Sequence, residues 1–89
     1  MKRTTVTVPW REGLHLWPAT RLVKLAQKFR SSIRLTCGAG MADAQSIFSI
    51  VALCAAMGTS MDVEVSGEDE QDAIRAVEAE FAPVSGEIV

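Results

Sequence analysis

The sequence predicts an α+β protein, an open-faced β-sandwich with elements in the order β-α-β-β-α-β-α. Short segments near residues 4–8, 32–37 and 61–67 alternate apolar and polar side chains, which is typical of strands with one buried face. Segments near residues 15–29 and 69–81 repeat apolar side chains at helical spacing. Alternating strands indicate a mainly antiparallel sheet covered on one face, and this favours the two-layer architecture.

The first strand and helix are delimited by prolines. The stretch TTVTVPW alternates around Val6, and Pro9 ends the strand because proline cannot donate to a sheet ladder. Apolar residues then recur at helical spacing up to about residue 29, with basic residues between them. Since a proline is tolerated only in the first turn of a helix, Pro18 requires the helix to begin between His15 and Trp17.

The central part predicts a hairpin and a second helix. SIRLTC at residues 32–37 alternates, GAG at 38–40 is a turn, and a short return strand runs from Met41 to Ala44. Ser46 is placed to open the next helix and Gly58 to close it.

The last part predicts a strand and a helix. MDVEVSG at residues 61–67 alternates again. Asp69 and Asp72 resemble a capping box, and apolar residues behind them mark a helix that ends near Phe81. We expect one domain over residues 1–89, with residues 83–89 as a loose C-terminal tail.

Composition excludes several classes of protein. The 89 residues are 48% hydrophobic, which is enough for a core, and the net charge of -2 argues against general nucleic-acid binding. No apolar run follows the N-terminal basic residues and none is long enough to span a bilayer, so we expect neither a signal peptide nor membrane insertion. Cys37 and Cys54 form no C-x-x-C pair, so reduced thiols and a cytoplasmic location are the simplest interpretation, with a disulfide or a metal site as the alternative. One histidine and two distant cysteines supply no metal site, and no nucleotide-binding motif or cofactor signature is present.

His15, the only histidine, is the candidate reactive residue. At a helix N-terminus it faces free backbone N–H groups and the positive end of the helix dipole, which disfavour an imidazolium. A neutral imidazole is a nucleophile, and a phosphoryl group attached there meets donors that already point at it. The pattern therefore suits a phosphohistidine carrier, with a surface histidine of no special role as the alternative.

The second predicted helix, SIFSIVALCAAM, is apolar nearly all round. A two-layer domain covers only one side of such a helix, so we expect an inward stripe of Ile50, Leu53, Cys54 and Met57. Ile47, Phe48 and Val51 then form an exposed partner-binding patch, unless tertiary packing hides it. Ser46 is first of all an N-cap, and its phosphorylation would add charge beside this patch.

These residues resemble HPr, the histidine-containing phosphocarrier family of the bacterial phosphoenolpyruvate-dependent sugar phosphotransferase system. The resemblance rests on GLH and PAT within residues 13–20, LVKLAQKF after them, AQSI around Ser46 and GEDEQDAI at the opening of the last helix. It implies a four-stranded antiparallel sheet with three helices on one face. It also implies that His15 takes phosphate from enzyme I and passes it to sugar-specific transporter components. By the same resemblance, HPr kinase phosphorylates Ser46, and Thr20, Ile47, Phe48 and Val51 dock partners.

The active-site motif departs from the family pattern G-L-H-A-R-P-A. Leu16 and Trp17 stand where the family has alanine and the arginine that steadies the phosphohistidine. Tryptophan offers one neutral donor and arginine five with a charge, so we expect weaker phosphotransfer unless Arg11 or Arg21 compensates. Glu12 adds a carboxylate that would repel a phosphate. Trp17 also suits a different role, as an aromatic anchor for a partner.

Three functions remain in competition. The first is a phosphocarrier, which carries a group and is not an independent catalyst. The second is an HPr-derived regulatory or docking module that binds partners without efficient transfer. The third is a ferredoxin-like domain that binds RNA or a small ligand, against which the lack of exposed strand aromatics argues.

Overall fold

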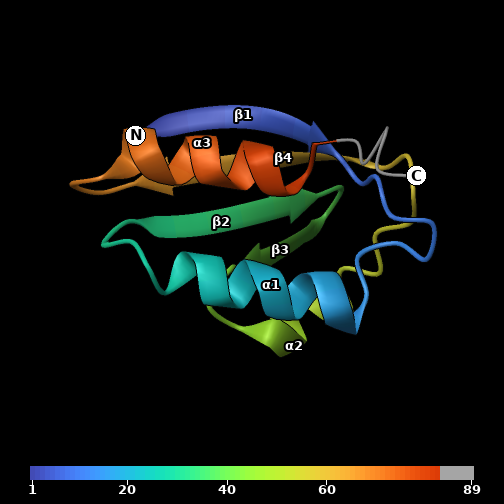
Figure 1. The fold of residues 1–89 in the computed structure, drawn as a ribbon. Coiled ribbons are helices and arrows are strands. Elements are labelled where there is room, and N and C mark those ends of the chain that lie inside the picture. Colours follow the sequence, from blue (N-terminus) through green and yellow to red (C-terminus); the bar gives the residue numbers. More distant parts are fainter. Residues whose placement is uncertain (83–89) are drawn as a thin grey trace, which may run out of the picture.

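The seven expected elements occur in the expected order in the computed structural model, which describes residues 1–82 (Figure 1). The tail expected over residues 83–89 lies outside the described residues. The elements are β1 (Lys2–Thr7), α1 (Leu16–Ala26), β2 (Ser32–Cys37), β3 (Gly40–Asp43), α2 (Ile47–Ala52), β4 (Ser60–Ser66) and α3 (Glu70–Glu80).

The strands form one antiparallel sheet in the order β1-β4-β2-β3. The uncovered face of this sheet carries a ladder of charges. Arg3 and Arg34 flank Glu64 on adjacent strands, with nitrogen–oxygen distances of 2.8 and 3.9 Å. These pairs are largely exposed, so each adds only about 0–1 kcal/mol to stability. Their main effect is on register, because a slip of one residue would turn the charges into the core.

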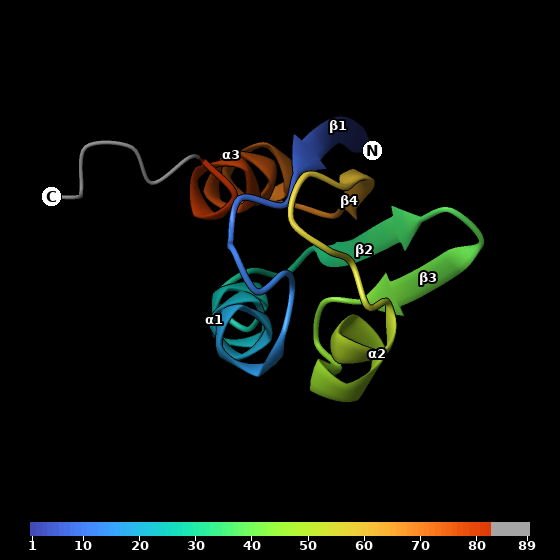
Figure 2. The same ribbon diagram turned by 90° about the vertical axis from the view of Figure 1, so that its right-hand side faces the viewer.

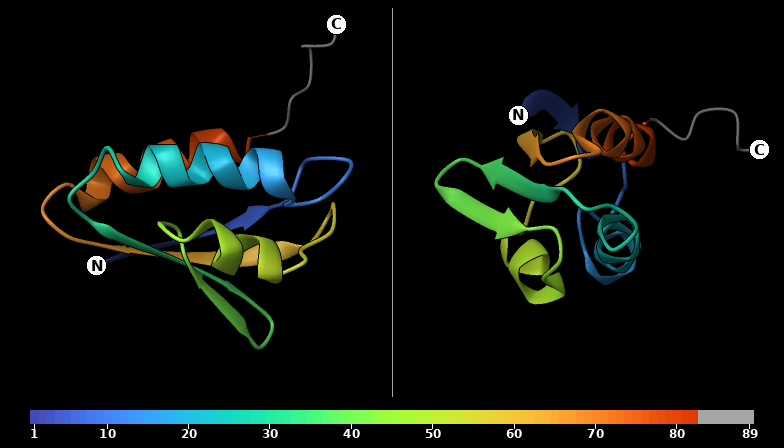
Figure 3. Two further views of the ribbon diagram at one scale, coloured as in Figure 1. Left: turned by 90° about the horizontal axis from the view of Figure 1, so that it is seen from below. Right: turned by 90° about the vertical axis from the view of Figure 1, so that its left-hand side faces the viewer.

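The other face of the sheet is covered by all three helices (Figures 2 and 3). α1 lies beside α3 and contacts α2, while α3 packs on β1 and β4 and α2 packs on β3. The alternating positions expected to point inward are buried, except Cys37 at the end of β2, which is partly buried. The largest fully buried side chains include Leu22, Ile33, Leu35, Ile50, Met61, Val63, Val65 and Val77.

The second helix is shorter than expected. α2 ends at Ala52, and Cys54 takes a positive φ of 52°, so the expected end at Gly58 is wrong. The expected inward stripe is also wrong beyond its first turn: Ile50 is buried, but Cys54 and Met57 are exposed. Leu53 and Cys54 close the helix with backbone bonds to Ile50 and Val51, and the chain that follows bonds to another loop. Gly58 donates a backbone hydrogen bond to Val8 across 2.9 Å.

The expected capping box at the last helix is wrong as well. Asp69 is the N-cap residue of α3, yet its side chain makes no capping bond. It accepts instead from the Ser31 hydroxyl at 2.6 Å and the Arg30 amide at 2.9 Å, and these bonds lower the pKa of Asp69. The Glu70 carboxylate accepts from the Gly67 amide at 3.1 Å. A short carboxylate that can reach a neighbouring buried serine bonds there in preference to its own helix.

Within residues 1–82 the helices all fall short of the length and apolarity needed to cross a bilayer. Cys37 and Cys54 are free thiols, so the disulfide alternative is not realised.

Candidate functional site

The loop that leads to His15 is hydrogen-bonded to the segment after α2. The Val8 amide donates to the Thr59 carbonyl at 2.9 Å, and the Leu14 amide donates to the Ala55 carbonyl at 2.8 Å. Leu14 and Ala55 are both buried. These bonds hold the loop against residues 55–59, and the early end of α2 makes that segment available. His15 is therefore positioned by a part of the chain forty residues away in sequence.

Gly13 is required by both conformation and space. Its φ is +81°, which lies in the left-handed region that favours glycine. A Cβ at this position would lie 2.6 Å from the Ala55 carbonyl oxygen, a backbone atom that cannot rotate away. The loop can approach Ala55 only because residue 13 has no side chain.

His15 is the N-cap residue of α1, as predicted from Pro18. Its carbonyl accepts from the Ala19 amide at 3.0 Å, the first bond of the helix. The amides of Leu16 and Trp17 lie in the first turn, where no intrahelical acceptor exists, and Pro18 has no amide hydrogen. Two backbone donors thus remain at the mouth of the helix beside the imidazole.

Among the described residues, the imidazole of His15 lies close to one carboxylate, that of Glu12. Its Nε2 lies 3.3 Å from Oε1 of Glu12, with the two side chains 39% and 78% exposed. The ring makes no capping hydrogen bond to the helix. It lines a shallow hollow of about 410 Å³ together with Pro9, Trp10, Arg11, Glu12 and Trp17. The histidine is thus accessible and held on one side by a carboxylate.

Trp17 is paired with Arg21 one turn along α1. The Arg21 guanidinium carbon lies 5.1 Å from the centroid of the Trp17 ring, a cation–π distance. Nε of Arg21 donates to the Glu80 carboxylate of α3 at 2.6 Å. Arg21 is therefore engaged by Trp17 and Glu80, while Trp17 stays 58% exposed.

The expected partner-binding residues differ in exposure. Phe48 is 85% exposed, as predicted. Ile47 and Val51 are only half-exposed and pack against the core, so their expected full exposure is wrong. α2 packs on both β3 and α1, and this covers more of the helix than one face. The Thr20 hydroxyl donates to the Leu16 carbonyl at 2.8 Å, and Leu16 is itself 63% exposed.

Ser46 is the N-cap of α2, as predicted. Its hydroxyl oxygen accepts from the Ser49 amide at 3.3 Å. The serine is half-buried and lies directly before the exposed Phe48 turn.

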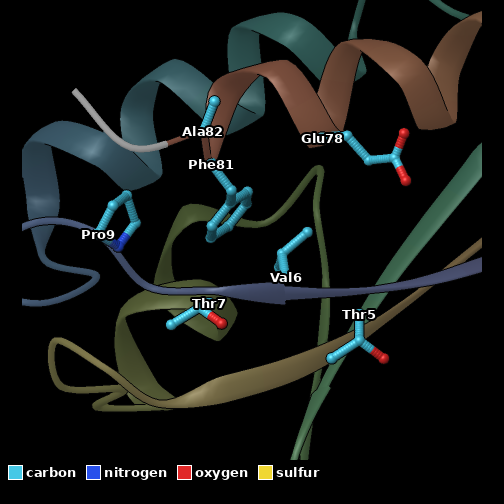
Figure 4. A pocket seen from close by; sticks show the side chains of 7 residues that line it. All are labelled: Thr5, Val6, Thr7, Pro9, Glu78, Phe81 and Ala82. Carbon is cyan, nitrogen blue, oxygen red and sulfur yellow. The ribbon is translucent and has the colours of Figure 1, made fainter. Parts of the chain in front are cut away.

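A larger hollow, of about 750 Å³, lies between β1 and the end of α3 (Figure 4). It is lined by Thr5, Val6, Thr7, Pro9, Glu78, Phe81 and Ala82. This lining contains no histidine or cysteine, and Glu78 already accepts a hydrogen bond from the Thr4 hydroxyl at 2.7 Å. The smaller hollow, which contains His15, is therefore the better candidate for a reactive site.

The fold and the site define a small α+β domain with an accessible histidine at the mouth of a helix. The family model described as "PTS HPr component phosphorylation site" matches residues 2–82. The chain is 42% identical over 62 residues to the phosphocarrier protein HPr of Haemophilus influenzae, covering 70% of this chain and 73% of that one. It is 32% identical to HPr of Cupriavidus necator, over 98% of each. The chain belongs to the HPr family of phosphocarrier proteins.

Other comparisons agree on family and fold. The phosphocarrier protein NPr of Proteus mirabilis is 36% identical, over 85% of this chain and 86% of that one. The crystal structure of HPr from Bacillus anthracis superposes with a TM-score of 0.85 at 26% identity, covering 91% and 96% of the two chains. The open-faced sandwich predicted from the alternating strands is thus confirmed.

Sequence reasoning missed three residues that shape the site: Gly13, Ala55 and Glu80. Gly13 has a detectable signal, because glycine is the usual residue where a tight turn needs a positive φ. Ala55 and Glu80 reach the site only through tertiary contacts with Leu14 and Arg21, so no local pattern marks them.

Proposed function

We propose that His15 accepts a phosphoryl group from an enzyme I-like donor and passes it to sugar-specific transporter components. The observation that carries the proposal is the half-exposed imidazole at the N-cap of α1, beside two amides without intrahelical acceptors. The protein acts as a carrier with a phosphohistidine intermediate, and the partners supply the catalytic machinery. The cytoplasmic location expected from two free thiols is part of the proposal.

The helix mouth supplies positioning and part of the charge stabilisation. Phosphoryl transfer depends mainly on these two factors, since little covalent chemistry is required of the acceptor. The amides of Leu16 and Trp17 can each donate to a phosphoryl oxygen, and the helix dipole adds about 0.3–1 kcal/mol. These backbone groups do not depend on the side chain at residue 17.

Trp17 weakens the charge stabilisation of the phosphoryl group, because it stands in place of an arginine. A hydrogen bond to a charged group contributes about 1.5–3 kcal/mol, so the missing arginine costs roughly tenfold or more in transfer rate. Arg21 is bonded to Glu80 and stacked on Trp17, which argues against its serving His15 in this conformation. Arg11 lines the hollow and is the remaining nearby cation.

The test is transfer from phosphoenolpyruvate through enzyme I to the purified protein, followed by mass spectrometry of the acid-labile phosphate. We expect one phosphate on His15, none on His15→Ala, and about tenfold faster transfer to Trp17→Arg. Slower transfer to Trp17→Arg would show instead that Trp17 anchors a partner. Absence of phosphate on the unaltered protein would refute the carrier function.

A docking module that transfers no phosphate is the second candidate. It is favoured by the exposed Trp17, whose ring lies against Arg21, because exposed aromatics are typical interface anchors. In that case His15→Ala would weaken partner binding although no phosphohistidine forms.

Regulation at Ser46 by HPr kinase is part of the proposal. Phosphorylation there would replace a capping hydroxyl by a dianion next to the exposed Phe48, and so change the surface that an enzyme I-like partner meets. Thr20, Ile47 and Val51 complete the proposed surface. Exposure of Phe48 and Leu16 supports this assignment.

A further inference from the structure

We infer that Glu12 is a positioning residue, which holds the proton of the His15 imidazole on Nε2 and so orients the ring for transfer. The inference rests on the proposed phosphoryl transfer to His15. It gives Glu12 a favourable role, in place of the repulsion that its charge alone suggests.

The side chains of Glu12 and His15 are in contact. Oε1 of Glu12 lies 3.3 Å from Nε2 of His15. An ionised carboxylate only accepts hydrogen bonds, whereas a neutral imidazole has one N–H and one lone pair. The contact is therefore favourable only when Nε2 bears the hydrogen. The lone pair is then on Nδ1, the nitrogen nearer to the backbone.

The position of His15 at the N-cap of α1 places Nδ1 near the backbone amides of the first helical turn. As the N-cap residue, His15 has its backbone fixed by the Gly13 carbonyl and the Ala19 amide, each at 3.0 Å. An acceptor atom near the backbone of an N-cap residue is the atom that normally faces the first-turn amides. The ring makes no capping bond to α1, so the lone pair stays available.

The transfer step balances with this proton placement. The Nδ1 lone pair forms the new nitrogen–phosphorus bond, and the bond between phosphorus and the donor breaks with its electron pair left on the donor. The ring becomes cationic, since it keeps the Nε2 proton. Glu12 faces that proton and stabilises the positive charge, as the carboxylate of a catalytic triad does for its histidine.

Repulsion between Glu12 and the phosphoryl group opposes this effect but is weaker. The transferred group is metaphosphate-like in a loose transition state, so its negative charge rises little there. It is also attached across the ring from the nitrogen that Glu12 contacts. Coulomb energy falls with distance, so the nearby ring charge outweighs the more distant phosphoryl charge.

The test uses phosphoramidate, a small phosphoryl donor that needs no protein partner, with ammonia as leaving group. Glu12→Ala should lower the phosphorylation rate about two- to fivefold, the range for an exposed ion pair. Heteronuclear NMR of the ring nitrogens at mildly alkaline pH should show a larger share of the Nδ1–H tautomer. Glu68→Ala is the matched control: Glu68 is 75% exposed and pairs with Arg30 at 3.6 Å, and its loss should change neither readout.

The inference requires that Glu12→Ala both slows phosphorylation and raises the share of the Nδ1–H tautomer. An equal or faster rate would mean that repulsion dominates, and an unchanged tautomer would mean that Glu12 does not orient the ring; either result overturns the inference. Failure of transfer from enzyme I, with the phosphoramidate and NMR results as expected, would instead refute only the proposed function.

Discussion

Replacing Gly13 by alanine should separate the cost of a left-handed backbone from the cost of the close approach to Ala55. Gly13 and Gly58 have similar positive φ values, +81° and +89°. A Cβ on Gly58 meets nothing within 4 Å, whereas a Cβ on Gly13 would lie 2.6 Å from the Ala55 carbonyl oxygen. Gly58→Ala is thus a control for backbone conformation alone.

The two substitutions should differ clearly in stability. A left-handed non-glycine residue costs roughly 1–2 kcal/mol, which is the whole cost expected for Gly58→Ala. Forcing extra atoms into a packed site costs about 1–3 kcal/mol more, so Gly13→Ala should lose about 2–5 kcal/mol. In a domain of this size each kcal/mol lowers Tm by about 4–8 °C.

Urea unfolding and calorimetry of the two variants measure this difference directly. Gly13→Ala should also be phosphorylated more slowly through enzyme I, because a displaced loop moves His15 away from the Leu16 and Trp17 amides. Equal losses of stability in the two variants would refute the reasoning, since they would show that the loop is not held against Ala55.

Three further outcomes are expected. Phe48→Ala should cost less than about 1.5 kcal/mol in denaturant unfolding and Phe81→Ala about 3–5 kcal/mol, because the rings are 85% and 3% exposed; equal costs would contradict the exposed position of Phe48. Ser46→Ala should lose about 1 kcal/mol of unfolding free energy, while Ser46→Asp should stay near the unaltered protein, since aspartate also caps a helix; equal losses would argue against the cap. The pKa of Asp69 is lowered on folding by bonds from the Ser31 hydroxyl and a backbone amide. The unfolded chain therefore takes up its proton first on acidification, and stability present above about pH 4 falls as the pH drops through the folded pKa. Asp69→Asn should flatten this acid branch of a stability–pH curve, and an unchanged branch would contradict it.

Local sequence patterns predicted the strands and the start of the first helix well, because neighbouring residues in the sequence determine these features. Alternation around Val6 and Val63 reflects the two faces of a sheet, and Pro18 restricts a helix start regardless of tertiary context. The N-cap role of Ser46 is local for the same reason.

The end of the second helix and the surroundings of His15 were not predictable in this way. An apolar run predicts a long helix, yet residues after Ala52 bond to the loop before His15 and leave the helix. The Arg21–Glu80 pair joins residues far apart in sequence. The contact between Glu12 and His15 is close in sequence, but its direction depends on the turn at Gly13.

The sheet order has a consequence for the time at which the site forms during synthesis. β1 pairs only with β4, and the loop before His15 is bonded to residues 55–59. In a nascent chain, β1 therefore has no strand to pair with until β4 has been made up to residue 66, although α1 can already contact α2. Pairings of such long sequence separation are typical of slow folding. The loop before His15, the residue proposed as phosphoryl acceptor, is thus held in place only after most of the sheet has been made, so a shorter nascent chain should be a poor acceptor.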